Sequence, residues 1–147
     1  MINTKPYEEL KDRQREEFNN FPIAYAFNKQ QLQEALDKLG AESIMECVSV
    51  FGHGDIVKKE NAMKLVEMMK RHDQEVAEAM KDYDFAVGAF LYEMNNHEYC
   101  INWEGDENVL GCFMLDFEKL EKLGLSGAYR TARQEHMRIA REEWEVI

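Results

Sequence analysis

The side chains whose types and spacing are best suited to metal binding or catalysis are a glutamate and a histidine four residues apart, Glu93 and His97. On a helix this spacing places both on one face, where they can hydrogen-bond or offer two ligands to a divalent metal ion. Zinc needs about two further protein ligands, which His136, Cys100 or Glu143 would have to supply through the fold. Two interpretations stay open: a metal site of Glu93, His97 and His136, or a partly buried histidine oriented by a carboxylate.

His136 is also a candidate for acid–base chemistry, because it lies in the middle of the apolar face of the last expected helix. That position also suits a core histidine held by one hydrogen bond, whereas an acid or base would need a cleft and a substrate anchor. The chain has no GxSxG, HExxH or CxxC pattern. Its cysteines, Cys47, Cys100 and Cys112, are far apart and are expected to be buried free thiols. We expect no cofactor.

A second chemical feature is a long run of one sign of charge. From Asp82 to Glu118 there are nine carboxylates and no Lys or Arg, in a chain with 29 acidic and 18 basic residues. Such a block builds a local potential that attracts cationic surfaces, whereas charge that only aids solubility is usually mixed in sign.

Three interpretations of the acidic run stay open: a solvated face, a contact surface for a basic protein, or ligands for Mg²⁺ or Ca²⁺. The spacing of the carboxylates is not that of an EF-hand loop. A contact surface would use aromatic anchors, for which Tyr83, Tyr99 and Trp103 are the candidates. The carboxylates assigned to it are Asp82, Asp84, Glu98, Glu104, Asp106, Glu107, Asp116 and Glu118.

The overall composition restricts the class of protein and of partner. With 147 residues, 45% hydrophobic and 32% charged, the chain suits a single globular domain over 1–147. A net charge of −11 disfavours direct binding to nucleic acid or anionic lipid, which depends on Lys and Arg. No apolar run approaches the about 18 residues needed to cross a bilayer, and the start lacks a secretory-signal pattern. We expect a cytoplasmic protein without membrane contact.

The elements that must position these side chains follow from hydrophobic periodicity and turn residues. Helices are expected over about 6–18, 28–40, 59–80, 82–97 and 126–144, a strand over 23–27 and a hairpin near 44–58. Between them we expect a short strand or extended segment at 99–103, an exposed acidic loop at 105–108 and one or two short helices in 109–123. The predicted fold class is α+β, mostly helical, with four longer helices, one of them central, and a small antiparallel sheet.

The helix expected to be central is the one from 82 to 97. Its first half is apolar almost all round, so it has no side that can face water and should have other elements packed around it. Gly88 would allow a close neighbour, and the polar residues after Glu93 indicate that the helix leaves the core there.

Two segments of the chain resemble a known family. They are YEELKDRQREEFNNFPIAYAFNKQQLQEALDKLG, from Tyr7 to Gly40, and FLYEMNNHEYC, from Phe90 to Cys100. They are similar to small uncharacterised proteins of phages and integrative mobile elements of gut Firmicutes, over about residues 5–102. The resemblance implies such an origin and a cytoplasmic setting. It brings no catalytic residues, because that family has no established activity.

These observations favour a non-catalytic, acidic accessory protein of a phage or mobile element that binds a basic protein partner through the 82–118 face. A narrower version of this hypothesis is a nucleic-acid mimic that blocks the cationic channel of a DNA-binding protein. The competing hypothesis is a small metal-dependent hydrolase that uses Glu93, His97 and His136.

Overall fold

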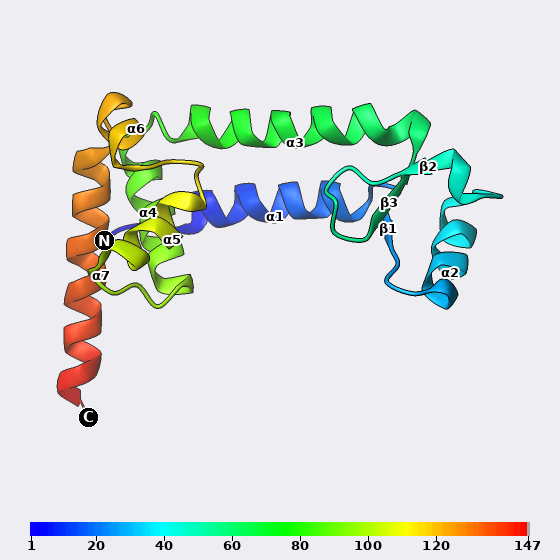
Figure 1. Cartoon of the computed structure of the whole chain (residues 1–147). Helices are drawn as coiled ribbons and strands as arrows, with labels where there is room; N and C mark the ends of the chain where they lie inside the picture. Colours follow the sequence, from blue (N-terminus) through cyan, green and yellow to red (C-terminus); the bar gives the residue numbers. More distant parts are fainter. Residues whose placement is uncertain (147) are drawn as a thin grey trace. The chain divides into compact units, whose positions relative to one another are not determined.

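The computed structural model describes residues 1–146, and their side chains as far as Trp144. This part of the chain is α+β and mostly helical, which confirms the predicted class. The helices are α1 (Lys5–Asn19), α2 (Lys29–Leu39), α3 (Lys59–Ala79), α4 (Tyr83–Asn96), α5 (Trp103–Gly111), α6 (Phe117–Lys122) and α7 (Ser126–Val146), with a 3₁₀ turn at Ile44–Glu46 (Figure 1). The strands are β1 (Ala24–Tyr25), β2 (Cys47–Val48) and β3 (Asp55–Lys58).

The contacts of the chain gather into two compact units, one of Met1–Arg13 with Glu75–Ile147 and one of Gln14–Gln74. Each unit has its own buried apolar residues. α1 and α3 are continuous helices that contribute to both units. The single domain expected from the length therefore stays a prediction.

The sheet belongs to the unit of Gln14–Gln74, and its strand order is β1-β3-β2. β3 is antiparallel to both neighbours, so the predicted hairpin is confirmed. The first strand of the hairpin, β2, is shorter than expected because Ser43 and Glu46 form a capping box, which starts a 3₁₀ turn before it. The strand expected over 23–27 is likewise reduced to β1.

α2 begins and ends where its local residues predict. The Asn28 side chain accepts a hydrogen bond of 2.8 Å from the backbone N–H of Gln31, which satisfies one of the free donors of the first turn. Gly40 ends the helix in the left-handed conformation, at φ 69°. The Gln31 side chain accepts from the backbone N–H of Phe27 and so holds the chain that enters the helix.

One buried carboxylate, Asp55, organises the loop between β2 and β3. It accepts hydrogen bonds from the hydroxyl of Ser49 and from the backbone N–H groups of Val50, Phe51 and His53. Burial by itself raises the pKa of Asp55, but the donors from Phe51, Ser49, Val50 and His53 outweigh it and lower the pKa to about 2.

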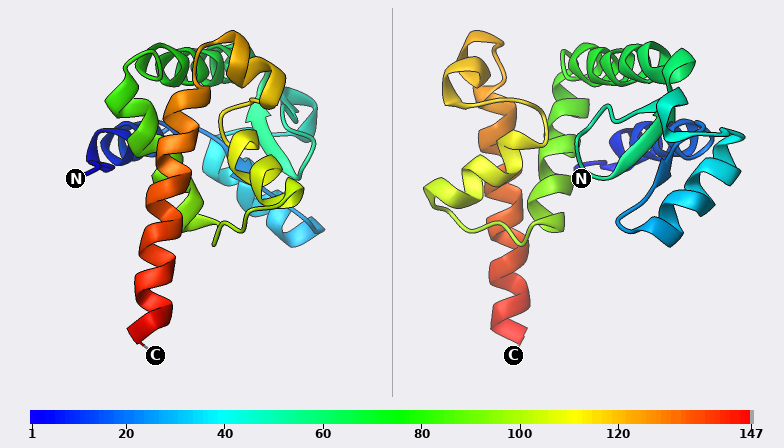
Figure 2. Two further views of the ribbon diagram at one scale, coloured as in Figure 1. Left: turned by 90° about the vertical axis from the view of Figure 1, so that its left-hand side faces the viewer. Right: turned by 45° about the vertical axis from the view of Figure 1, so that its right-hand side comes forward.

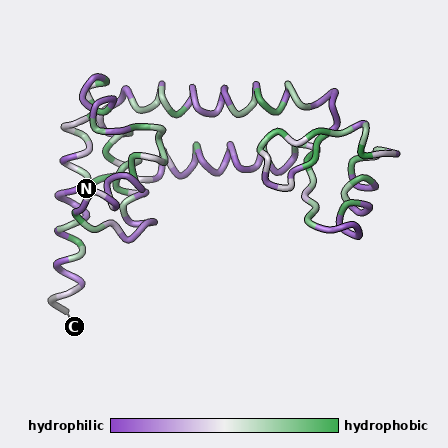
Figure 3. Tube along the Cα trace, viewed as in Figure 1, coloured by the Kyte–Doolittle hydropathy of each residue, from purple (hydrophilic) through white to green (hydrophobic). Residues whose placement is uncertain are grey.

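α4 is the centre of the other unit, as the sequence predicts. Its residues from Ala86 to Leu91 are all buried, and α7 lies along it in both orientations shown in Figure 2. The rings of Phe90 and Tyr129 meet edge to face at 5.2 Å, a favoured geometry for an aromatic pair. In Figure 3, α3 by contrast alternates between hydrophilic and hydrophobic along its length, as an amphipathic helix does.

The prediction of an exposed acidic loop at 105–108 is wrong, because these residues belong to α5. The Asn102 side chain accepts from the backbone N–H of Gly105 at 2.6 Å and so starts the helix at Trp103. Gly105 suits this tight entry, since a Cβ there would lie 2.1 Å from the carbonyl oxygen of Cys100. The extended segment expected before the helix forms no strand among the described residues.

Gly88→Ala should destabilise the protein, although alanine favours a helix over glycine by about 1 kcal/mol. An added Cβ would lie 2.3 Å from the carbonyl oxygen of Asn3, so the backbone before α1 would have to move. We expect a net loss of about 2 kcal/mol in the free energy of unfolding, measured in urea. The matched control is Gly127→Ala in α7, where nothing lies within 4 Å of the new Cβ. Equal stability of the two variants would contradict the close contact.

Asp55 should make the protein sensitive to acid. Its pKa is lowered from 3.8 in the unfolded chain to about 2 in the fold, so its stabilisation is fully present above pH 4 and is lost as the pH falls towards 2. Asp55→Asn should therefore cost about 2 kcal/mol at pH 7 and clearly less at pH 2. Denaturant unfolding at the two pH values measures this cost. A loss of unfolding free energy that is the same at both pH values would argue against stabilisation by an ionised Asp55.

Candidate functional site

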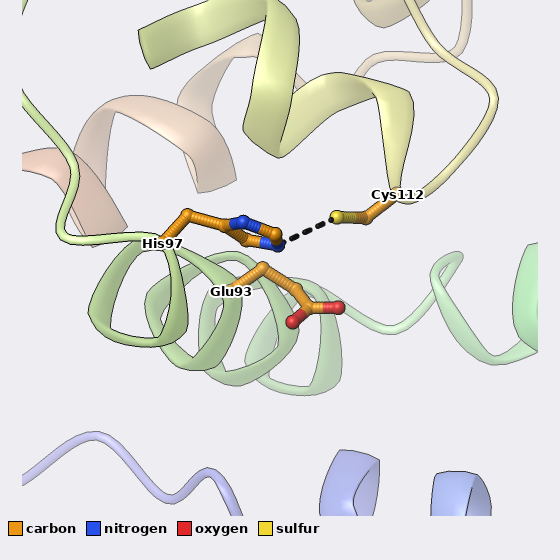
Figure 4. Close-up of side chains that lie close together, drawn as sticks. All are labelled: Glu93, His97 and Cys112. Atoms are coloured by element: carbon orange, nitrogen blue, oxygen red, sulfur yellow. Dashed lines mark hydrogen bonds between the residues drawn. The ribbon is translucent and has the colours of Figure 1, made fainter.

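A cluster of three potential ligands lies where α4 and α5 end. Glu93 is in the last turn of α4, His97 directly follows that helix, and Cys112 directly follows α5. Each offers one ligand atom, and these atoms all lie within 4.8 Å of one another (Figure 4). His97 Nε2 and Cys112 Sγ are 3.3 Å apart. The helical spacing thus places Glu93 and His97 together, as predicted, and the fold adds Cys112.

Glu93 is held in one orientation by two residues of α1. Glu93 is 1% exposed, and its Oε2 accepts from the Tyr7 hydroxyl at 2.7 Å and from Lys11 Nζ at 3.0 Å. Such partners are needed because removing a charge from water is costly. Burial, followed by the hydrogen bond and charge of Glu93, raises the pKa of Tyr7, so the phenol remains a donor. The other carboxylate oxygen, Oε1, has Asn96 Nδ2 at 3.5 Å.

Cys112 does not have the surroundings of a nucleophilic thiol. Partial burial of the thiol, and then the negative charge of Glu93, raise its pKa to about 11. Activated cysteines lie next to cations or at helix N-termini, whereas Cys112 follows the C-terminus of α5, where the helix dipole disfavours an anion. At neutral pH the thiol is protonated and donates to the carbonyl oxygen of Asn108 at 3.3 Å. The His97–Cys112 contact is therefore not a thiolate–imidazolium pair.

His136 is not part of this cluster. Its Nδ1 is 2.7 Å from the side-chain oxygen of Asn95, and its Nε2 is 3.1 Å from the carbonyl oxygen of Tyr99. Both ring nitrogens face oxygen atoms, so the histidine links α7 to the end of α4 and the segment after it. In the three-residue group, Cys112 takes the place that the sequence assigned to His136.

The expectation that all three cysteines are buried holds only for Cys47, since Cys100 and Cys112 are exposed. Cys112 is 15 residues from His97, and no motif connects the two. The only signal in the sequence was the presence of a soft ligand near a Glu–His pair, and that signal did not distinguish Cys112 from Cys100.

Seven of the nine carboxylates between 82 and 118 are exposed, and several of them have local structural roles. Asp82 and Asp116 accept backbone N–H groups at the starts of α4 and α6. Glu118 pairs with Lys122 at 2.9 Å. Carboxylates stabilise helix N-termini, so part of the acidic run is explained by capping.

Asp106 and Tyr99, which the sequence analysis assigns to an exposed contact surface, are buried in the structure. They are 8% and 4% exposed. One carboxylate oxygen of Asp106 accepts from the Tyr99 hydroxyl at 2.6 Å and from the Tyr129 hydroxyl. This buried network ties α5 to α7, because an ionisable group inside a protein needs hydrogen-bond partners.

The acidic residues that remain exposed around α5 accompany two apolar side chains. We call the exposed acidic and apolar residues at and just before α5 the α5 face; they are Glu98, Ile101, Trp103, Glu104 and Glu107. Trp103 is 75% exposed and Ile101 58%. Asp82 and Asp84 lie at the other end of α4, whose 14 residues span about 21 Å. The 82–118 run is therefore not one continuous patch. Tyr83, Trp103 and Phe117 are exposed aromatic residues next to its carboxylates, and Trp103 of the α5 face is the most exposed of these three.

Asp106→Ala should lower the free energy of unfolding by about 3 kcal/mol, because two buried tyrosine hydroxyls lose their acceptor. Asp106→Asn, which keeps one acceptor oxygen, should cost less. Glu107→Ala is the matched control: this neighbouring carboxylate is exposed, so its loss should change stability by about 0.5 kcal/mol or less. Thermal and urea unfolding measure the three variants, and an Asp106→Ala protein as stable as Glu107→Ala would refute the buried network.

No helix in the described part of the chain has both the length and the apolar character required to cross a membrane. No curated protein and no solved structure matches the chain. A family model matches residues 6–135, a range that includes the Glu93–His97–Cys112 cluster and the whole α5 face. The match continues past Asn102, where the resemblance noted in the sequence ends. The chain therefore belongs to the family of unknown function DUF7659.

Proposed function

We propose that this chain is an interaction protein that captures a basic protein through the α5 face. The observation that carries the proposal is Trp103, a large aromatic side chain that is 75% exposed in a stretch with no Lys or Arg. An exposed tryptophan is a frequent energetic centre of protein interfaces, since burying it removes much apolar surface from water.

The arrangement around Trp103 has the composition of an interface. Trp103 and Ile101 provide an apolar centre, and Glu98, Glu104 and Glu107 provide a charged rim. Glu107 is one helical turn after Trp103, so the two share a side of α5. The complementary partner has an apolar pocket surrounded by Lys or Arg.

The charge of the whole chain supports the same partner class. A net charge of −11 repels anionic surfaces and speeds the encounter with cationic ones. The rim carboxylates then select a partner that places its own cations around the tryptophan pocket. The proposal includes a cytoplasmic setting and an origin in a phage or mobile element, which the resemblance of Tyr7–Gly40 and Phe90–Cys100 supports. A DNA-binding protein is one partner of this chemistry.

The charge of the α5 face can be tested with a defined probe, an amphipathic Arg/Leu peptide, titrated calorimetrically into the full-length protein. Glu104→Lys with Glu107→Lys should weaken binding by more than about tenfold and reduce its dependence on salt. Glu34→Lys with Glu42→Lys, two exposed acids of the other unit, changes the net charge by the same amount and should have a much smaller effect.

A matched pair of tryptophan variants tests whether Trp103 is the aromatic anchor. Trp103→Ala should weaken binding of the same peptide by about tenfold or more, whereas Trp144→Ala should leave it unchanged, although Trp144 is 78% exposed. If the two charge pairs weaken binding equally, the peptide senses only bulk charge; if Trp144→Ala weakens binding as much as Trp103→Ala, the α5 face is not the binding surface.

A further inference from the structure

We propose that Glu93, His97 and Cys112 form a binding site for a zinc ion, with a fourth coordination position open to solvent. This inference is independent of the proposed interaction function, because none of the three residues belongs to the α5 face.

The separations of the ligand atoms fit one ion. With Zn–S and Zn–N bonds of about 2.3 and 2.1 Å, a sulfur and a nitrogen on a tetrahedral zinc ion stand about 3.6 Å apart. The observed distance between Cys112 Sγ and His97 Nε2 is 3.3 Å, and a carboxylate oxygen of Glu93 lies within 4.8 Å of both atoms. Small side-chain rotations would bring all three to bonding distance.

The types of ligand select the metal. A thiolate and an imidazole favour zinc and related transition metals, whereas Mg²⁺ and Ca²⁺ bind oxygen ligands almost exclusively. The carboxylate completes a mixed set of sulfur, nitrogen and oxygen donors of the kind that zinc accepts. The rise in the pKa of Cys112 caused by burial and by Glu93 does not oppose this, because a coordinating metal ion displaces the thiol proton.

The surroundings of Glu93 resemble the outer shell of a metal site. Tyr7 and Lys11 both donate to Oε2, which fixes the plane of the carboxylate and leaves Oε1 with the long 3.5 Å contact to Asn96. Such outer hydrogen bonds orient metal ligands in proteins. The positive charge of Lys11 also balances one of the two negative charges that a carboxylate and a thiolate would bring to the site.

The site is accessible and incomplete by itself. His97 and Cys112 are exposed while Glu93 is buried, so an ion can enter from the solvent side. Only three such ligands gather in the described part of the chain, and zinc takes four. The fourth position would hold water or a group from a bound molecule.

A thiol–imidazole hydrogen bond, together with the helical spacing of Glu93 and His97, would also place these three side chains close together without a metal ion. The two explanations differ in what happens when metal is added, so a titration separates them.

The test uses the reduced, metal-free, full-length protein, titrated with Zn²⁺ by calorimetry and with Co²⁺ by absorption spectroscopy. We expect one ion per chain and a thiolate-to-cobalt charge-transfer band. Cys112→Ser should abolish the band, and both Cys112→Ser and His97→Gln should weaken zinc binding by more than about tenfold. The matched controls Cys100→Ser and His53→Gln remove an exposed thiol and an exposed imidazole outside the cluster and should bind zinc as the wild type does.

Circular dichroism establishes that each variant is folded, and His97→Gln keeps the test decisive if Cys112→Ser does not fold. The proposal is overturned if the wild type binds no stoichiometric zinc, if the cobalt band survives in Cys112→Ser, or if Cys100→Ser loses as much affinity. The peptide titrations run in the presence of a chelator, so either proposal can fail without the other.

Discussion

Helix α4 has no side that can face water, and the arrangement of its unit follows from covering it. Phe90 packs against Tyr129 of α7, and the rings of Phe90 and Phe113 lie 5.0 Å apart. Gly88 lets the backbone at Asn3 approach closely on another side. Glu93, a buried carboxylate of this helix, must then be compensated, which explains why Tyr7 and Lys11 converge on it. The polar cluster with His97 and Cys112 forms where the buried helix ends.

Features fixed by neighbours in the sequence could be predicted, and those fixed by distant residues could not. Asn28 and Gly40 bound α2 through contacts within a few residues, and Asp82 caps α4 in the same way. The central position of α4 also follows from its own composition. The start of α5 was missed because Gly105 and its acidic neighbours have turn-like chemistry, while the Asn102 cap outweighs it.

The candidate site shows the same division. The pairing of Glu93 with His97 follows from helical spacing, but the third residue depends on how the end of α5 meets the end of α4, which no local pattern determines. The acidic run mixed three roles that sequence alone does not separate. Asp82 and Asp116 cap helices, Asp106 is a buried acceptor for two tyrosines, and Glu104 is an exposed acid on the surface of α5.

The hydrogen bond between Tyr7 and Glu93 joins residues 86 positions apart. At the usual rate of protein synthesis, α1 therefore waits about 4 to 17 seconds for the helix that it covers. Gln14–Gln74 is complete before α4 is made and can fold first. During that interval Tyr7 lacks its native partners from α4, Glu93 and the rings of Phe85 and Tyr92.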